Sequence, residues 1–340
     1  MKPFDPKATP AQRLAAVEQF AKTLAADDRP IILGPWRSEV GFEGLYWLPF
    51  LAKLAKIVPK FKERSVVLTR GGMGQLYKHL SAGAVDLYAM RSVVEVRRRN
   101  LADHQRSKLQ KQMAPTAWDE QLVADAARAA GFGALYHTVH PAWMYWACAP
   151  WWDETAGLSH LAALTDYAVL KKPELAPDAP LPPRYVAMKW YNRATFPYLD
   201  PNHNRELAAF IKGVVGRVAE QIPVVVLASS PEYDDHVDIP IQGKNIQSLD
   251  INADPTQNLF QQATVLAHAT AFVGVYGGVA QLALRMGVPS VSFYAQWGAT
   301  AHAHLALSSA LSKKTGVEFC VGDIKDAALW AQVVDSKAVL

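Results

Sequence analysis

One stretch near the C-terminal end, residues 271–294, restricts the fold more than any other part of the chain. It reads AFVGVYGGVAQLALRMGVPSVSFY. The apolar run 271–275 predicts a short strand that is buried on both faces, as in a parallel sheet. The glycines at 277 and 278 form a turn, and apolar residues at helical spacing over 279–287 predict a helix that ends at a glycine C-cap. Residues 290–294 predict a second buried strand.

The Gly277-Gly278 turn places bare backbone N–H groups at a helix N-terminus, where the helix dipole favours an anion. The same glycines also suit ordinary helix–strand packing, because they permit close approach of two backbones. The turn alone leaves both uses open. Its pattern is neither G-x-G-x-x-G nor G-x-x-x-x-G-K-[ST], so it supports neither a dinucleotide fingerprint nor a P-loop.

The chain, at 340 residues, is long enough for two domains. Residues 171–183 read KKPELAPDAPLPP, which is the composition of a semi-rigid linker. We therefore expect an N-terminal domain over 1–175, a linker over 176–184 and a C-terminal domain over 185–340. A final helix near 324–334 can fold back across both domains.

Strands and helices alternate in each half of the chain. Strands are expected at 30–33, 65–69, 85–88, 185–190, 223–228, 244–249, 271–275 and 290–294. Residues 92–130 are expected to be helical and polar. This alternation predicts an α/β protein with two doubly wound sheets. Ligands bind such sheets beyond the carboxyl ends of the strands. The loops to inspect therefore follow Leu33, Thr69, Trp190, Ala228 and Val275.

The composition excludes several classes of protein. Half of the residues are hydrophobic and 19% are charged, which indicates a globular protein rather than a disordered one. A net charge of +4 is too small to indicate nucleic-acid binding, but it suits an anionic substrate or an anionic membrane surface. Two cysteines are too few for a disulfide framework, and the N-terminus lacks an apolar signal region, so we expect a cytoplasmic protein. The sequence has no clean apolar run of about 20 residues, so we expect no membrane span.

Basic and polar residues follow the first strand of the second half. There, Lys189 and Arg193 can face the glycine turn and form a two-sided clamp for an anion, although a basic surface loop is the alternative. The candidate phosphate-binding residues are Lys189, Asn192, Arg193, Tyr276, Gly277, Gly278, Val279 and Gln281. A weaker set lies in the acidic loop after 228, which suits contact with a ribose better than a metal: Ser229, Asp235 and His236. We expect no metal site.

The loop after the first strand carries the candidate catalytic carboxylates. A carboxylate on a strand-end loop is well placed to take a proton from a hydroxyl group. We expect Glu39 to be the base because it lies nearest the strand end, with Glu43 as second choice. Either glutamate also suits a purely structural role at a helix N-terminus. Candidate residues for binding the group that carries the hydroxyl are Trp36, Arg37, Ser38 and Arg70.

Three motifs resemble bacterial glycosyltransferases of the GT-B type. The segments FVGVYGGVAQLA (272–283) and GVPSVSFY (287–294) resemble the donor-site turn and following strand of that family, and GPWRSEVGFE (34–43) resembles its N-terminal acceptor loop. The resemblance implies two Rossmann-like domains that face each other across a cleft, with the nucleotide-sugar donor in the C-terminal domain. The donor helix departs from the family's E-x(7)-E pattern, having Gln281 instead, which leaves the stereochemistry and the nucleotide open.

The resemblance implies transfer of a hexose or octulosonic acid from a UDP-, GDP- or CMP-sugar to a glycan or lipid-linked acceptor. Such enzymes act in bacterial surface polysaccharide or lipopolysaccharide synthesis, without a cofactor or metal, in the cytoplasm or in peripheral contact with the inner membrane. Nucleic acid is not an expected partner. A sugar-nucleotide epimerase or a polysaccharide pyruvyl transferase on the same scaffold is an alternative. A non-catalytic nucleotide- or glycan-binding module is another.

Overall fold

The computed structural model describes residues 4–107, 112–175, 180–192, 196, 201–227, 237–249, 254–296 and 301–326. The chain forms two compact units. The first comprises Met1–Ala168 and Asp254–Phe260, and the second comprises Val169–Ala253 and Gln261–Leu340. The linker expected over 176–184 falls in the second unit in this division, and its residues 176–179 lie outside the described ranges. Of the helix expected over 324–334, only the 3-10 turn η3 (Ile324–Asp326) is described.

The first unit contains a four-stranded parallel sheet with the order β3-β2-β1-β4. Its strands are β1 (Ile31–Leu33), β2 (Ser65–Thr69), β3 (Gly83–Asp86) and β4 (His137–Val139). In this sheet β1 is an inner strand, with Ile31 opposite Ser65 of β2 on one side and opposite His137 of β4 on the other. All three residues of β1 are buried, as expected for a strand covered on both faces.

The helices of the first unit are set by clear local signals. Thr9 and Gln12 form a capping box at the start of the first helix, which buries Val17, Ala21 and Leu24. The helices of this unit are α1 (Pro10–Ala25), α2 (Val40–Phe42), the π-helical turn η1 (Glu43–Trp47), α3 (Leu48–Ala55), α4 (Phe61–Arg64), the 3-10 turn η2 (Met73–Tyr77), α5 (Leu87–Met90), α6 (Val93–Ser107), α7 (Ala117–Ala129), α8 (Ala142–Trp152) and α9 (Leu158–Leu164).

The helical character expected over 92–130 is found in two separate helices. Two helices, α6 and α7, occupy this range, and residues 108–111 between them lie outside the described part. Pro115 disfavours a helical conformation at the residue before it, and Thr116 then starts α7 with a capping box that includes Asp119.

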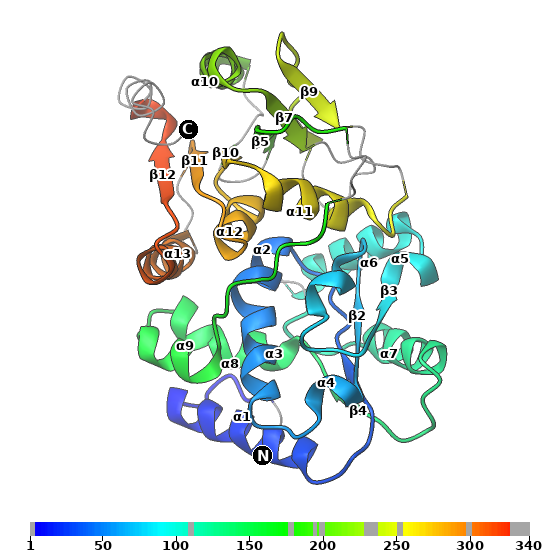
Figure 1. The fold of residues 1–340 in the computed structure, drawn as a ribbon. Helices are drawn as coiled ribbons and strands as arrows, with labels where there is room; N and C mark the ends of the chain where they lie inside the picture. The colour runs from blue at the N-terminus through cyan, green and yellow to red at the C-terminus, as the bar shows by residue number, and fades with distance from the viewer. Residues whose placement is uncertain are drawn as a thin grey trace. The chain divides into compact units, whose positions relative to one another are not determined.

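The second unit contains a six-stranded parallel sheet with the order β12-β11-β10-β5-β7-β9, which can be followed across the sheet in Figure 1. Its strands are β5 (Val186–Lys189), β7 (Val224–Leu227), β9 (Ile246–Leu249), β10 (Ala271–Val275), β11 (Ser290–Tyr294) and β12 (Phe319–Asp323). A separate antiparallel ribbon pairs β6 (Tyr191–Asn192) with β8 (Val237–Asp238). The helices are α10 (Pro201–Gln221), α11 (Asn258–His268), α12 (Gly278–Arg285) and α13 (Ala301–Thr315).

Both sheets have the strand order of doubly wound α/β folds. Numbered along the chain within the second unit, the six parallel strands lie in the order 6-5-4-1-2-3, and those of the first unit lie in the order 3-2-1-4. Read from either edge, this is the 3-2-1-4-5-6 arrangement or its first four strands. The predicted α/β class with two parallel sheets is confirmed. The order reverses direction between β1 and β4 in the first unit and between β5 and β10 in the second.

The stretch 271–294 forms the predicted strand, helix and strand, as β10, α12 and β11. Every residue of β10 is buried. Gly274 is required by packing, because a Cβ atom there would lie 2.2 Å from the Lys189 carbonyl oxygen of the neighbouring strand β5. Among the described residues, no helix is both long enough and apolar enough to cross a membrane.

Candidate functional site

The carboxyl ends of β1 and β4 mark the expected ligand site of the first unit, because doubly wound sheets bind ligands where the strand order reverses. The loop 34–39 follows β1, and α8 follows β4 after a short connection. Four of the residues predicted to bind or activate a hydroxyl-bearing ligand lie on this loop: Trp36, Arg37, Ser38 and Glu39.

The backbone of the loop after β1 is fixed at almost every residue. The Gly34 N–H donates to the Val139 carbonyl (2.9 Å), and the Trp36 N–H donates to the Leu68 carbonyl (2.8 Å), so the loop is bonded to the ends of both neighbouring strands. The Ser38 carbonyl accepts a hydrogen bond from the Arg70 guanidinium. These bonds leave the loop little freedom to move.

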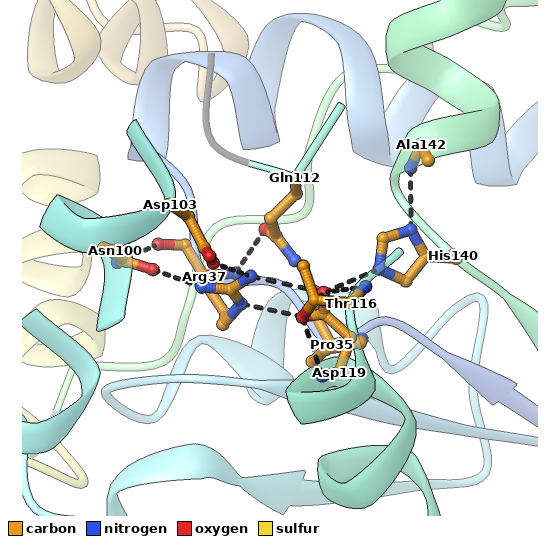
Figure 2. A network of polar contacts seen from close by, with 9 residues as sticks. All are labelled: Pro35, Arg37, Asn100, Asp103, Gln112, Thr116, Asp119, His140 and Ala142. Carbon is orange, nitrogen blue, oxygen red and sulfur yellow. Dashed lines mark hydrogen bonds and ion pairs between the residues drawn. The ribbon is translucent and has the colours of Figure 1, made fainter. Parts of the chain in front are cut away.

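Arg37 is the centre of a buried polar network that holds the same loop, as Figure 2 shows. Its guanidinium donates to both carboxylate oxygens of Asp119, at 2.9 and 3.3 Å, to Asn100 Oδ1 at 2.6 Å and to Asp103 Oδ2 at 3.1 Å. Its backbone N–H donates to Gln112 Oε1 (2.8 Å), and its carbonyl accepts from Asn100 Nδ2 (3.1 Å). Both the backbone and the side chain of Arg37 are therefore fixed.

Asp119 connects this network to α7 and to the segment after β4. Besides Arg37, its carboxylate accepts the backbone N–H and the hydroxyl of Thr116, at 3.0 and 2.7 Å, and lies 3.6 Å from His140 Nε2. Although burial alone favours the neutral acid, the contact with His140 and the charge of Arg37 lower the pKa of Asp119 to about 2. The other ring nitrogen, His140 Nδ1, accepts the Ala142 N–H at the start of α8.

The network corrects the roles predicted for Arg37 and Trp36. The Arg37 side chain is fully buried and its donors are directed at internal acceptors, so it is not an open ligand-binding group. The Trp36 ring is also fully buried, stacked between Trp47 and Tyr145 at centroid distances of 5.6 and 6.2 Å. Both residues fix the loop through these internal contacts.

Glu39 is the first loop residue whose side chain lies outside these internal contacts. It is the N-cap of α2, is half-buried, and makes no capping hydrogen bond with its carboxylate. Neither a hydrogen bond nor an ion pair of this carboxylate is found within the described ranges. A half-buried carboxylate without a capping bond, on a loop whose backbone is hydrogen-bonded, is available to a ligand.

Glu43 lies in a different environment, although it is only one turn further along the chain. It is fully buried in η1, and its Oε1 accepts from Tyr77 OH at 2.5 Å and from Thr69 Oγ1 at 3.0 Å. Burial raises the pKa of Glu43, and the nearby charge of Arg70 opposes this shift. The structure thus separates the two predicted carboxylates: Glu39 is accessible to a ligand and Glu43 is enclosed.

Arg70 directly follows β2 and is succeeded by a turn of two glycines. Gly71 and Gly72 both have positive φ, at 65° and 79°. The Gly72 N–H donates to Asp86 Oδ2 at the end of β3 (2.8 Å), and the Gly71 carbonyl accepts the Phe260 N–H (2.9 Å). Burial raises the pKa of Asp86. The positive φ values favour glycine at both positions.

In the second unit, the order reverses between β5 and β10, so the expected site lies around the start of α12. Gly277 is the N-cap of this helix, Gly278 and Val279 are half-buried, and no side chain caps the first turn. Tyr276 is buried, with its N–H bonded to the Phe293 carbonyl, and Gln281 is buried one turn further on. An uncapped first turn at a strand's carboxyl end suits an anion.

The sequence predicts Lys189 as an open phosphate-binding residue, but the structure buries its side chain. Its ammonium group is buried and donates to the Leu227 carbonyl at 2.9 Å, Gln262 Oε1 at 3.1 Å and Asp238 Oδ2 at 3.3 Å. All three acceptors belong to the second unit, so the ammonium group is engaged in internal contacts. Burial lowers the pKa of Lys189, and Asp238 opposes the shift. The geometry therefore gives Lys189 a structural role that links β5, β7, β8 and α11.

The remaining predicted residues of the second unit are described only in part. Asn192 is half-buried in β6, where it pairs with Val237 of β8. Arg193, Ser229, Asp235 and His236 lie outside the described residues.

The second unit also contains a groove and a smaller cavity. A groove of about 950 Å³ lies between α10 and residues 239–246 and includes none of the predicted site residues. A cavity of about 230 Å³ is lined by Trp190, Leu227 and Asp238, among others, near the ammonium group of Lys189. No group of three or more His, Cys, Asp or Glu residues that could hold a metal ion occurs within the described residues.

Several residues of the first unit's site have no sequence signal strong enough to predict them. Asp119 and Asn100 lie on polar helices, and Tyr77 lies in a 3-10 turn. The capping box T-x-x-D at Thr116 is a recognisable pattern, and it identifies Asp119 as a cap but not as the partner of Arg37.

The comparisons with known proteins give remote similarities only. The sequence matches no protein-family model, and no curated protein matches it. The structure is similar to the heptosyltransferase WaaC of E. coli, with 12% identity and a TM-score of 0.46 over 91% of this chain and 100% of WaaC. It is also similar to a glycosyl transferase family 9 protein from Veillonella parvula, with 14% identity and a TM-score of 0.38 over 79% and 81% of the two chains.

A third similar structure is the iron-containing dodecameric glycosyltransferase TibC of enterotoxigenic E. coli. It shares 12% identity with a TM-score of 0.40, and the match covers 78% of this chain but only 58% of TibC. The assignment of two doubly wound sheets rests on the strand order described above and not on these similarities.

Proposed function

We propose that this chain is a glycosyltransferase. It moves a sugar from a nucleotide-activated donor to a glycan or lipid-linked acceptor in bacterial surface polysaccharide synthesis, without a metal ion. The first unit binds the acceptor, and the second unit binds the donor. A lipid-linked acceptor brings the reaction to the cytoplasmic face of the inner membrane, where the protein makes peripheral contact.

The observation that carries this proposal is the contrast between Glu39 and the loop that holds it. The backbone of residues 34–38 is bonded to both neighbouring strands, to Arg70 and to the Arg37 network, whereas the Glu39 carboxylate has no capping bond and is half-buried. Catalytic groups work best when their support is rigid and the group itself is available to the substrate. Glu39 meets both conditions.

The chemistry assigned to Glu39 is general-base catalysis. Its carboxylate takes the proton of an acceptor hydroxyl as the hydroxyl oxygen forms a bond to the anomeric carbon of the donor sugar. The bond between that carbon and the donor phosphate breaks, and its electron pair leaves with the phosphate oxygen. The nucleotide product therefore gains negative charge, which needs stabilisation in the second unit.

Backbone N–H groups at the start of α12 supply this stabilisation. The turn Gly277-Gly278 follows β10 directly, and the first turn of the helix has neither an acidic residue nor a side-chain cap. The positive end of the helix dipole is thus available to a phosphate group. Lys189 is left out of this step because its ammonium group is buried and donates to three acceptors within the second unit.

The test combines a ligand panel with two matched glutamate variants. UDP-, GDP- and CMP-sugars are screened by thermal shift, together with ADP-heptose, because the structurally similar TibC has been solved in complex with ADP-D-beta-D-heptose. A ligand at 100 times its Kd stabilises a protein by about 2.7 kcal/mol. Glu39→Gln and Glu43→Gln each replace a carboxyl group by an amide, four residues apart, and serve as each other's control.

We expect Glu39→Gln to reduce kcat by about 100- to 10,000-fold with the donor Kd unchanged, as for the loss of a general base. Glu43→Gln is expected to have a smaller effect on kcat, because the carboxylate is enclosed and an amide oxygen can still accept from Tyr77. If no nucleotide sugar stabilises the protein, or if Glu39→Gln retains full transfer activity, the proposal is wrong. Binding of a nucleotide sugar without turnover by the wild type would indicate a binding module instead.

A further inference from the structure

Tyr145 is held at the place where the strand order of the first unit reverses. It lies in the first turn of α8, shortly after β4, and only 1% of it is exposed. Its ring is parallel to that of Trp36 within 2° (centroids 6.2 Å apart) and packs on Phe42 at 5.7 Å and on Trp152 at 5.8 Å. Three aromatic contacts from three segments fix the direction of the phenol ring.

The hydroxyl group of this tyrosine is not explained by the packing of its ring. Its oxygen is buried and makes no hydrogen bond of normal geometry within the described residues. A buried polar group without a partner destabilises the folded state. A phenylalanine would make the same ring contacts without this cost, so the packing of α8 does not account for a tyrosine here.

The groups around the hydroxyl are those of the candidate site. The Ser38 side chain lies beside it, and the charges of Glu39, Arg70 and Arg37 act on it. These groups come from the loop after β1 and from the end of β2, on the side of the sheet's carboxyl ends. Burial raises the pKa of Tyr145, so its O–H remains protonated and can only donate to a carboxylate.

We propose that Tyr145 is a positioning residue for Glu39, an inference that rests on the proposed function. The Glu39 charge acts on the Tyr145 hydroxyl, and Glu39 follows Ser38, the residue whose side chain lies beside that hydroxyl. The hydroxyl oxygen is buried without a hydrogen bond of normal geometry, and the Glu39 carboxylate makes no capping bond, so a donor and an acceptor are both available. When the acceptor binds, the Glu39 carboxylate turns and accepts the Tyr145 O–H with one oxygen. Its second oxygen is then held in place for the proton of the acceptor hydroxyl.

Tyr145→Phe tests this pairing because it removes one oxygen and keeps the ring. The matched control is Tyr185→Phe, which removes the hydroxyl of a tyrosine that is also buried but donates to the Val265 carbonyl at 2.7 Å. We expect Tyr145→Phe to keep or raise the melting temperature, whereas Tyr185→Phe lowers it. The effects on transfer activity should be the opposite of those on the melting temperature. We expect kcat to fall by about 10- to 100-fold in Tyr145→Phe, as for a lost hydrogen bond to a charged group, and to stay unchanged in Tyr185→Phe.

The pH profile and a double variant show whether Tyr145 acts through Glu39. A donated hydrogen bond favours the ionised carboxylate, so the acid limb of the kcat–pH profile should move to higher pH in Tyr145→Phe while the donor KM stays constant. In a Glu39→Gln background, Tyr145→Phe should have little further effect, because both changes disable the same group.

The possible results separate this inference from the proposed function. If the wild type transfers sugar and Tyr145→Phe is equally active, or if the two substitutions multiply their effects independently, the positioning role is wrong and the glycosyltransferase proposal stands. If Tyr145→Phe melts several degrees lower than the wild type, the hydroxyl is structural and the positioning role is again wrong. If the wild type transfers no sugar from any donor, the proposed function fails and this inference fails with it.

Discussion

Asp119→Asn is the sharpest test of how the loop after β1 is held. The Arg37 and Asp119 side chains are 0% and 1% exposed, and two hydrogen bonds join them. Removing one partner of a buried ion pair costs about 3–5 kcal/mol, because it leaves the other charge buried without compensation. Asp103, at 3.1 Å with 23% of its side chain exposed, retains part of the attraction, so we expect about 3 kcal/mol.

The loss should be visible in thermal unfolding. For a domain of this size, about 1 kcal/mol corresponds to about 2–4 °C in Tm, so the first unit should melt about 6–12 °C lower. The matched control is Asp125→Asn on the same helix, where Asp125 bonds Arg91 and Arg128 nearer the surface. We expect a loss below about 1 kcal/mol there. If Asp119→Asn is no more destabilising than Asp125→Asn, the buried pair does not hold the loop.

The same pair predicts a pH dependence with a definite sign. The pKa of Asp119 is about 2 in the folded protein against an ordinary value of 3.8, a difference of 1.8. At 1.36 kcal/mol per pKa unit, this carboxylate contributes about 2 kcal/mol of stability. The contribution is complete above the unfolded pKa and is lost as the pH falls through the folded one. The stability difference between wild type and Asp119→Asn should therefore narrow between about pH 4 and pH 2, and a constant difference would contradict the assigned cause.

Three further substitutions test the second unit and the enclosed carboxylate. Lys189→Met should lower the free energy of unfolding by about 3 kcal/mol, because it removes the ion pair with Asp238 and the other hydrogen bonds of the buried ammonium group. The donor Kd should change little; a urea melt and a donor titration measure the two effects. Gly274→Ala should lower the free energy of unfolding by at least about 1–3 kcal/mol, because the new Cβ would lie 2.2 Å from a backbone oxygen. The control is Gly213→Ala, where a new Cβ has no neighbour within 4 Å, and it should be neutral or slightly stabilising in the same melt. Burial raises the pKa of Glu43, so this carboxylate lowers the free energy of unfolding at high pH and stops doing so as the pH falls through its folded pKa. In urea melts at several pH values, Glu43→Gln should therefore be less destabilised, relative to the wild type, at high pH than at low pH.

Much of the fold follows from local sequence patterns. The strands 65–69, 271–275 and 290–294 have the predicted bounds, because continuous apolar runs between turn signals are the clearest sign of a buried parallel strand. The strand β4 was not predicted, since its residues His137-Thr138-Val139 show no apolar run. The order of the strands in each sheet depends on pairing between distant segments, which no local pattern specifies.

The candidate site was predictable only at the level of loops. Strand-end topology identifies the loop after β1 and the turn before α12, but the exposure of each side chain depends on partners far along the chain. Arg37 is buried because it bonds Asp119, which lies 82 residues further on, and Lys189 is buried because its acceptors come from β7, β8 and α11. The separation of an accessible Glu39 from an enclosed Glu43 likewise depends on Thr69 and Tyr77.

The membership of Asp254–Phe260 in the first unit means that the protein cannot be divided at a single peptide bond. A polypeptide ending at residue 168 would lack Leu259 and Phe260, whose side chains lie against the Gly71-Gly72 turn, and the hydrogen bond from the Phe260 N–H to Gly71. A polypeptide starting at residue 169 would carry those two apolar side chains with nothing to cover them. Separately expressed halves should therefore be less soluble than the intact chain. An isolated first unit with its complete set of contacts requires residues 254–260, either fused to the polypeptide or added as a peptide.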